Sequence, residues 1–192
     1  MPRPNRSDER RVELTPVLAE AFAQLGYAGA TTAKLAAHCE LAENQLYRLW
    51  SSKKAMFLAV IDHLYEQQAR WWKEQLEEGD PATVVARILE KEGRERGSTG
   101  LHRVLFAGLS ATEDEEIRTA LKSMYRSFHR FIADLLKQHA KASGGIGLQP
   151  ELAAWALIGL GTVSNIAREL DLFPVSTQRK LMREAGEPLA GI

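Results

Sequence analysis

Cysteines, long apolar runs and secretion signals are scarce or absent in this chain of 192 residues. Its one cysteine, Cys39, has no second cysteine with which to form a disulfide within the chain, as is usual in a reducing cytoplasm. No stretch approaches about 18 uninterrupted apolar residues, so no membrane partner is predicted. The N-terminal residues MPRPNRSDERR are charged and lack the apolar run of a secretion signal. We therefore predict a cytoplasmic location.

The motifs of common enzymes are also missing. The sequence contains no HExxH, P-loop or GxSxG motif, and no His follows a Glu by three residues, as a di-metal site in a helical bundle would require. The five His residues are scattered, and the acidic run 113–116 is explained as the first turn of a helix. We predict no catalytic residues, no bound metal and no cofactor.

The chain has no excess of charge of either sign, since its formal net charge is zero. Residues 1–55 carry a slight excess of Lys and Arg, and the remainder carries an equal excess of acids. This asymmetry has the sign expected of a DNA-binding head, but it is small. Non-specific DNA affinity should be modest, because counterion release scales with the number of phosphates neutralised.

Strand signals are nearly absent and helix boundaries are frequent, which predicts an all-α chain of about nine helices. Pro16 lies inside the first run: either it kinks the helix, or Thr15 is the N-cap and Pro16 the first helical residue. The tail GEPLAGI is expected to be irregular. The predicted helices cover about 7–26, 33–39, 43–50, 52–78, 81–96, 101–110, 113–142, 150–171 and 177–185.

Residues 31–54 are predicted to form two short helices joined by a tight turn, followed by Lys53 and Lys54. One face of the second helix would pack, and the other would display Asn44, Gln45, Tyr47 and Arg48. Asn and Gln can pair with adenine, Arg with guanine or phosphate, and Tyr with phosphate. DNA binding is therefore the leading hypothesis; an ordinary solvated face, with Tyr47 half-buried, is the alternative.

Four N-terminal arginines allow a second DNA contact. They would enter the minor groove as an arm, in the way that homeodomain arms do. A disordered N-terminus that serves only solubility is the alternative interpretation. The arginines are Arg3, Arg6, Arg10 and Arg11.

Aromatic and His side chains recur on the predicted middle helices. Binding pockets for small molecules are mostly apolar with a few polar anchors, so these side chains are candidates for an effector pocket. Aromatic residues at helical spacing also form ordinary core. The candidates are Tyr65, Trp72, His102, Phe106, Tyr125, Phe128 and His129.

Residues 152–167, LAAWALIGLGTVSNIA, are apolar on almost every side. Such a helix must be covered on both sides, and Gly159 and Gly161 allow close backbone approach. A second copy packing there as a four-helix interface is one explanation; deep burial within a monomer is the other. The residues predicted for this dimer interface are Trp155, Ile158, Gly159, Thr162, Val163 and Ile166.

Residues 10–60 resemble the TetR family of bacterial one-component regulators. The residues at that family's spacing are Phe22, Gly26, Tyr27, Thr31, Thr32, Leu35, Ala36, Leu46, Tyr47, Trp50, Ser52 and Lys53. The resemblance implies a homodimer with paired helix-turn-helix heads and a C-terminal body that binds a small effector. It would make residues 1–52 the helix-turn-helix DNA-binding domain and residues 53–192 the effector-binding and dimerisation domain, with a long helix linking them.

By position, the resemblance implies that Tyr47 and Lys53 contact phosphates and that Thr31 or Thr32 is a cap on the phosphate side. The base-reading residues would be Asn44, Gln45 and Arg48. Two positions depart from the family: Glu40 stands where Gly is usual, and Ala42 where Ser is usual. A left-handed Glu40 would cost about 1 kcal/mol, and Ala42 removes a side-chain cap. We expect weaker or more selective operator binding.

The function predicted is a TetR-like transcriptional regulator, a repressor released from its operator by a small apolar or aromatic effector. Two heads of a homodimer would insert helix 43–50 into successive major grooves of double-stranded DNA. The alternative is a helical dimeric ligand-binding or protein-interaction module that has lost DNA binding. A small-molecule carrier or enzyme would instead bind or turn over a ligand without DNA affinity.

Overall fold

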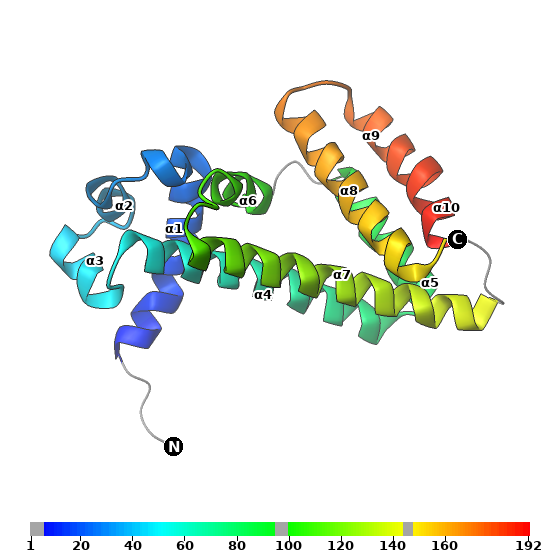
Figure 1. Cartoon of the computed structure of the whole chain (residues 1–192), viewed down its shortest axis with the longest axis horizontal. Helices are drawn as coiled ribbons and strands as arrows, with labels where there is room; N and C mark the ends of the chain where they lie inside the picture. Colours follow the sequence, from blue (N-terminus) through cyan, green and yellow to red (C-terminus); the bar gives the residue numbers. More distant parts are fainter. Residues whose placement is uncertain (1–5, 95–99, 144–147) are drawn as a thin grey trace, which may run out of the picture. The chain divides into compact units, whose positions relative to one another are not determined.

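Every regular element of the described residues is a helix, which confirms the predicted all-α class (Figure 1). The computed structural model describes residues 6–94, 100–143 and 148–192. Since α9, the π-helix η1 and α10 follow one another without a break, these residues form nine helical runs. The helices are α1 (Arg6–Gly29), α2 (Thr32–His38), α3 (Glu43–Leu49), α4 (Lys53–Glu78), α5 (Pro81–Arg94), α6 (Leu101–Leu109), α7 (Glu115–Ser143), α8 (Pro150–Glu169), α9 (Val175–Leu181), η1 (Met182–Gly186) and α10 (Glu187–Ala190). None of the helices in this part of the chain is long and apolar enough to cross a membrane.

Helix α1 differs from both predicted roles of Pro16. Pro16 lies inside the helix, and within Arg6–Gly29 the residue with non-helical angles is Gly26 (φ 67°, ψ 167°). The Thr15 hydroxyl is not an N-cap, because it donates to the carbonyl oxygen of Arg11 at 2.7 Å. The bend therefore lies at Gly26, where a positive φ is tolerated without a Cβ, and one more helical turn follows.

The end of the chain is more regular than the sequence suggested. The expected helix near 177–185 continues through η1 and α10, so five residues of the tail that was expected to be irregular, 186–190, are helical. Ala190 is buried, and the carbonyl oxygen of Gly191 lies 3.0 Å from His139 Nε2. Packing against α7 explains the regularity, which local sequence signals do not show.

The chain divides into two compact units. Unit 1 is Met1–Gln67 with Thr99–Met124, and unit 2 is Gln68–Ser98 with Tyr125–Ile192. Helices α4 and α7 are each divided between the units: the first part of each belongs to unit 1 and the rest to unit 2. The boundary expected between residues 52 and 53 lies inside unit 1 and does not coincide with the division into compact units. It concerns the separation of DNA binding from effector binding, and it stays a prediction.

Unit 1 is built around an aromatic core. The ring of Phe57 on α4 lies edge-on to Phe22 of α1 at 4.9 Å between centroids, and 4.8 Å from Tyr27. Helix α1 also packs against α6. Gly108 of α6 permits close approach of α7 and α4, because a Cβ there would lie 3.1 Å from Leu121 and 3.3 Å from Phe57. This core holds the first helices as one body and thereby positions α2 and α3.

Unit 2 has an aliphatic core formed by α5, α7, α8 and the final helical run. A buried polar contact joins two of its helices: Gln178 Nε2 of α9 donates to Ser164 Oγ of α8 at 2.6 Å. Gly186 in η1 leaves room for Leu89, whose Cδ2 would lie 2.8 Å from an added Cβ. The core side chains are Val84, Val85, Leu89, Ala133, Leu135, Leu136, Ala153, Ala154, Leu157, Met182 and Ala190.

Candidate nucleic-acid interface

The turn between α2 and α3 is a Schellman motif centred on Glu40. Glu40 N donates to the carbonyl oxygen of Ala37 at 3.1 Å, and Leu41 N donates to that of Ala36 at 3.0 Å. Glu40 has a φ of 53°, so it occupies the left-handed position that Gly usually fills in this motif. Glu40 therefore has the left-handed conformation for which the sequence analysis expected an energetic cost.

Both short helices begin with a hydrogen bond from a backbone N–H to a side-chain oxygen. Thr31 Oγ1 accepts from Lys34 N at 3.3 Å and caps α2. At the start of α3, Gln45 Oε1 accepts from Ala42 N at 3.0 Å, which is one half of a capping box. Ala42 has no hydroxyl with which to supply the other half. Gln45, predicted to contact bases, thus also closes the first turn of its own helix.

Helix α3 separates a buried side from an exposed side. Leu46 is fully buried and Trp50 nearly so, whereas the four polar side chains predicted to face DNA are all exposed. Tyr47 is 47% exposed, and its hydroxyl lies 3.1 Å from Thr32 Oγ1 of α2. The exposed set, which we call the polar face of α3, is Asn44, Gln45, Tyr47 and Arg48.

Lys53, predicted to contact phosphate, has a structural role in this conformation. Its Nζ donates to the carbonyl oxygen of Tyr27 at 2.9 Å and lies 4.4 Å from the centre of the Tyr27 ring. The contact ties the start of α4 to the end of α1. Two of the three ammonium hydrogens stay available for another acceptor.

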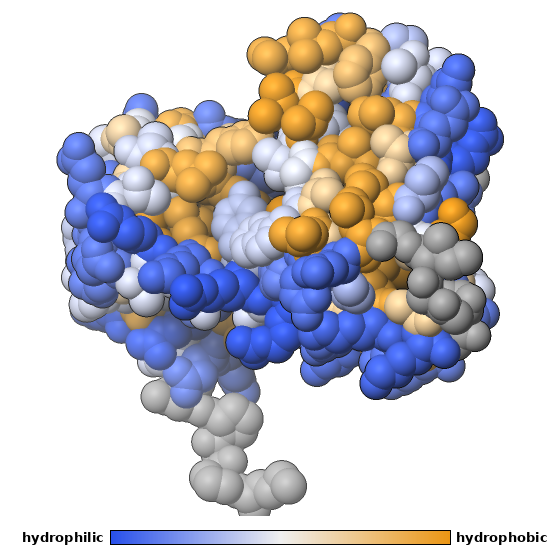
Figure 2. Space-filling view, turned by 45° about the vertical axis from the view of Figure 1, so that its right-hand side comes forward, coloured by the Kyte–Doolittle hydropathy of each residue, from blue (hydrophilic) through white to orange (hydrophobic). Residues whose placement is uncertain are grey.

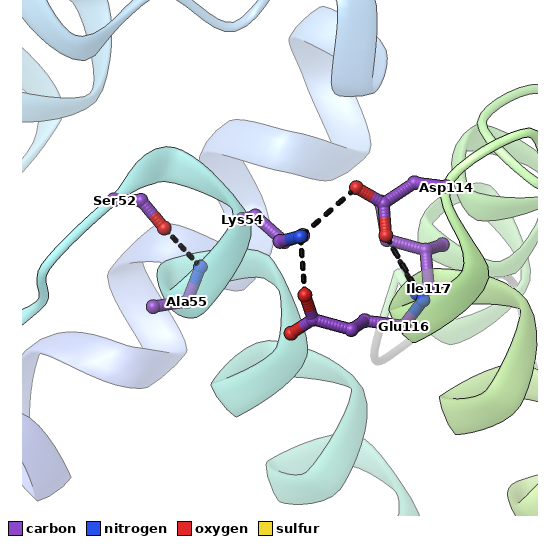
Figure 3. A network of polar contacts seen from close by, with 6 residues as sticks. All are labelled: Ser52, Lys54, Ala55, Asp114, Glu116 and Ile117. Atoms are coloured by element: carbon purple, nitrogen blue, oxygen red, sulfur yellow. Dashed lines mark hydrogen bonds and ion pairs between the residues drawn. The ribbon is translucent and has the colours of Figure 1, made fainter.

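The next residue, Lys54, joins α4 to the start of α7 within unit 1 (Figure 3). Its Nζ lies 3.1 Å from Asp114 Oδ2 and 2.5 Å from Glu116 Oε1. Asp114 Oδ1 also accepts from the backbone N of Glu116 and Ile117 and so caps α7. The hydrogen bond from Lys54 holds the pKa of Asp114 below its usual range, and the bond to Glu116, ahead of that to Asp114, raises the pKa of Lys54.

Cys39 lies on the packing side of α2 and is 5% exposed. Burial raises the pKa of its thiol, which therefore stays protonated near neutral pH. Among the described residues, no group of three His, Cys, Asp or Glu side chains is arranged to hold a metal ion.

The side chains predicted to line an effector pocket are divided between the units. Tyr65, His102 and Phe106 belong to unit 1, and the other four belong to unit 2. In unit 2, Trp72 stacks on Phe131 at 4.5 Å and meets Phe128 edge-on at 5.1 Å. Phe131 was missed by the sequence analysis, although it lies three residues after Phe128 on the same helix.

The indole of Trp72 carries an unsatisfied donor. The ring is 5% exposed, and its Nε1 has no hydrogen-bond partner among the described residues. Tyr125, next in this aromatic cluster, has its phenol pKa raised by burial and stays neutral. A buried N–H without an acceptor is unfavourable by about 1–3 kcal/mol, so the cluster is suited to a molecule that supplies one.

Helix α8 exposes the apolar face predicted from its sequence (Figure 2). Trp155, Val163 and Ile166 are 47%, 54% and 37% exposed, Gly159 is exposed, and Ile158 and Thr162 are half-buried. The exposed side chains that extend this face, and that were not predicted, are Leu148, Leu152 and Leu170. A large uncovered apolar face is typical of an interaction surface.

His129, predicted for the effector pocket, packs against this helix, and its role in a pocket stays a prediction. Its ring stacks on Trp155 at 4.5 Å, and its Nε2 lies 2.9 Å from the carbonyl oxygen of Glu151. Lys137 of α7 pairs with the Glu151 carboxylate at 3.0 Å and lowers its pKa. These contacts fix the first turns of α8 on α7.

Comparison with known proteins gives a family match for the N-terminal helices that carry the polar face of α3, which we call the head. Residues 17–60 match the family model described as bacterial regulatory proteins, tetR family, which confirms the resemblance predicted from residues 10–60. No curated protein matches the chain significantly in sequence.

Solved structures extend the similarity of fold to the whole chain. A putative TetR-family regulator from Rhodococcus sp. superimposes with a TM-score of 0.80 at 20% identity, covering 95% of this chain and 99% of the other. A putative transcriptional regulator from Saccharomonospora viridis in complex with choline superimposes with a TM-score of 0.82 at 16% identity, covering 92% of this chain and 95% of the other. AibR, in complex with isovaleryl coenzyme A and operator DNA, superimposes with a TM-score of 0.66 at 17% identity, covering 81% of this chain and 85% of the other.

Proposed function

We propose that this chain, which carries the DNA-binding region of the TetR family and has the fold of TetR-family regulators, represses transcription until a small effector releases it from its operator. The observation that carries the proposal is the polar face of α3, which is exposed on a helix whose opposite side is buried. Such a helix can enter a major groove while its buried side keeps it attached to the head.

Within this proposal the side chains of the head divide into two groups. Asn44, Gln45 and Arg48 would meet base edges, where amide and guanidinium groups pair with adenine and guanine. Tyr47 and Lys53, with Thr31 and Thr32 at the start of α2, would face phosphates and fix the register. The hydroxyl contact between Thr32 and Tyr47 supports this grouping, because it places two phosphate-seeking groups together.

The division is tested by measuring the affinity of variants for operator and scrambled duplexes over a range of salt concentrations. Tyr47→Ala and Lys53→Ala should both weaken binding to every sequence, and Lys53→Ala, which removes a positive charge, should also flatten the salt dependence. Gln45→Ala should instead relax sequence preference. Gln45→Glu is a useful companion, because a carboxylate keeps the acceptor for Ala42 N while changing the base-facing group. Equal losses from all variants, with preference unchanged, would contradict the division.

The operator-bound form would be a homodimer joined through α8. The uncovered apolar face of this helix supports the proposal, because a second copy would bury the side chains that now meet water. A two-fold dimer also sets half-site spacing for two heads. Sedimentation of the purified chain tests this directly.

The effector would bind at the aromatic cluster formed by Trp72, Tyr125, Phe128 and Phe131 in unit 2. An apolar or aromatic molecule with an acceptor oxygen fits best, because it would receive the indole N–H of Trp72. Within the described part of the chain no charged side chain is buried, which favours an uncharged effector. Since α4 carries both Trp72 and the two lysines that anchor its start, an effector would act on the head by shifting this helix. It can do so only if it binds the two states with different affinity.

Trp72→Phe tests the effector site, because it removes the N–H and keeps an aromatic ring. Compounds that raise the melting temperature of the wild-type chain and release it from DNA should bind this variant about tenfold more weakly. Trp71→Phe is the matched control, since Trp71 lies beside Lys91 rather than in the cluster. Equal affinity of both variants for every compound would place the effector elsewhere.

A dimeric module that has lost DNA binding is the second candidate. It is favoured by Glu40, which adds a negative charge and a strained backbone beside the polar face of α3. A gel shift with the DNA upstream of the chain's own gene separates the two candidates, because only a regulator should retard it specifically.

A further inference from the structure

Arg11 connects two helices that are far apart in sequence. Its Nε donates to the carbonyl oxygen of Leu49 at 2.7 Å, and Leu49 is the last residue of α3. Its Nη1 binds Asp8 Oδ1 at 3.0 Å, one turn earlier on α1. The guanidinium is thus held by its own helix and reaches the end of another, 38 residues away.

The carbonyl that Arg11 contacts has no acceptor role within its own helix. Trp50 N closes the last turn of α3 on Leu46 O at 3.0 Å, and the extended angles of Trp50 (φ −133°, ψ 134°) take the chain out of the helix. The terminal carbonyls of a helix carry partial negative charge, which a cation stabilises. Because α3 has only seven residues, its orientation depends on contacts from outside the helix.

We infer that Arg11 is a positioning residue: it fixes the C-terminal end of α3 to α1 and so sets the angle at which Asn44, Gln45 and Arg48 meet base edges. This role differs from the minor-groove arm expected from the sequence, since residues 6–11 are helical and two guanidinium nitrogens are already engaged. The inference rests on the proposed function of α3.

Arg10 provides a matched control for Arg11. It has the same charge, lies next to Arg11 on α1 and is similarly exposed, with its Nη1 2.8 Å from Glu13 Oε2. That pair is confined to α1. Arg10→Ala therefore removes one positive charge from the head without removing a contact to α3.

The experiment compares the full-length wild-type chain with Arg11→Ala, Arg10→Ala and Arg11→Lys. The specific probe is a duplex that the wild-type protein selects from a random pool, and the second probe is its scrambled version. Fluorescence anisotropy at several salt concentrations gives the ratio of specific to non-specific affinity and the salt slope. Circular dichroism identifies the temperature at which all variants are folded.

We expect Arg11→Ala to reduce the ratio of specific to non-specific affinity by about fivefold or more, which is the effect of misplacing one base contact. Arg10→Ala should leave the ratio unchanged, and Arg11→Lys should restore part of it, because an ammonium can still donate to Leu49 O. A loss of folding stability alone would not change this ratio among folded molecules, so the readout separates orientation from stability.

Two results would overturn the inference while leaving the proposed function intact. In one, Arg11→Ala and Arg10→Ala have the same ratio as the wild type. In the other, Arg11→Ala alone flattens the salt slope by about one ion with the ratio unchanged, as a direct phosphate contact would. If the wild-type chain selects no duplex from the pool, the proposed function is overturned, and this inference with it.

Discussion

Helices α3 and α8 both leave one face uncovered, but the two faces are of opposite chemical kind. Helix α3 is short and displays amide, phenol and guanidinium groups. Helix α8 has 20 residues and displays Trp155, Val163 and Ile166 among other apolar side chains. Water solvates the first face well and the second poorly, which favours the proposed homodimer contact at the second face.

The two helices are also held in different ways. Helix α3 is capped at its start by its own Gln45, and side chains of other helices contact its middle and end, Thr32 of α2 at Tyr47 and Arg11 of α1 at Leu49 O. Helix α8 is held mainly by a long apolar contact on its inner side, to which the buried pair of Gln178 and Ser164 and the contacts of Glu151 with α7 add polar links. The polar face of α3 is thus oriented by directional hydrogen bonds, whereas the apolar face of α8 is supported mainly by the apolar surface that the helix buries on its inner side.

The largest expected effect is that of a charge placed on the face of α8. Val163→Glu should leave the chain monomeric at micromolar concentration, because the carboxylate would have to be desolvated in the interface. Operator affinity should fall by about 100-fold or more, since two linked heads bind far more tightly than one. Analytical ultracentrifugation and anisotropy measure the two effects. Gln138→Glu adds the same charge at an exposed position of α7, and equal behaviour of both variants would rule out α8 as the interface.

Removing the polar contact on the inner side of α8 should have the next largest effect. Gln178→Ala leaves the buried Ser164 hydroxyl without its donor and opens a cavity, which together should lower the free energy of unfolding by about 2–3 kcal/mol. Urea denaturation of the variant measures it. Gln138→Ala, at an exposed position, should change little. A double variant with Ser164→Ala should recover part of the loss; if it does not, the hydrogen bond is not the reason for the effect.

A smaller and opposite effect is expected at the start of α3. Ala42→Ser supplies the missing half of the capping box and should stabilise the protein by about 1 kcal/mol. Differential scanning calorimetry should show the increase. Ala37→Ser introduces the same side chain inside α2 and should be neutral or slightly destabilising. A gain at Ala37 equal to that at Ala42 would mean that capping is not its cause.

The smallest effect is expected from the ion pairs of Lys54. Because the pKa of Asp114 is lowered in the folded state, its contribution is present above the usual aspartate range and is lost as the pH falls below about 4. The pKa of Lys54 is raised, so its charge persists well into the alkaline range. Asp114→Asn keeps the cap of α7 but removes the ion pair with Lys54, so it should be less stable than the wild type at pH 7, and this difference should shrink as the pH falls below the usual aspartate range.

Asp134→Asn is the control for that measurement, since Asp134 makes a looser pair with Lys137 at 3.5 Å on the surface of α7. Its stability at pH 7 should differ little from that of the wild type, because an exposed ion pair contributes little to folding. A deficit of Asp114→Asn that persists unchanged in acid would show that the ion pair with Lys54 is not responsible.

The helices and the face of α3 could be predicted because they depend on local signals. Gly79, Asp80 and Pro81 end α4 and start α5 where capping chemistry requires, with Asp80 Oδ1 accepting from the backbone N of Ala82 and Thr83. Likewise, the spacing of Leu46 and Trp50 separated the packing side of α3 from its polar side. These features follow from residues within one or two turns of one another.

The contacts that orient the head could not be predicted in this way. Lys53 reaches Tyr27 O and Arg11 reaches Leu49 O, and in both cases a side chain meets a backbone carbonyl of a distant element. Any residue supplies that acceptor, so no sequence pattern marks it. The same holds for Gln45, whose role as a cap competes with the base contact inferred from its type.

The burial of Cys39 has a practical consequence for measuring the proposed effector-induced change in the separation of the two heads. The natural thiol is covered and protonated, so a cysteine introduced at an exposed site would be the one that reacts with a spin label. Glu20→Cys on the outer side of α1 would attach one probe to each head of a dimer. Dipolar spectroscopy would then follow head separation in solution, with no need to replace the native sulfur first.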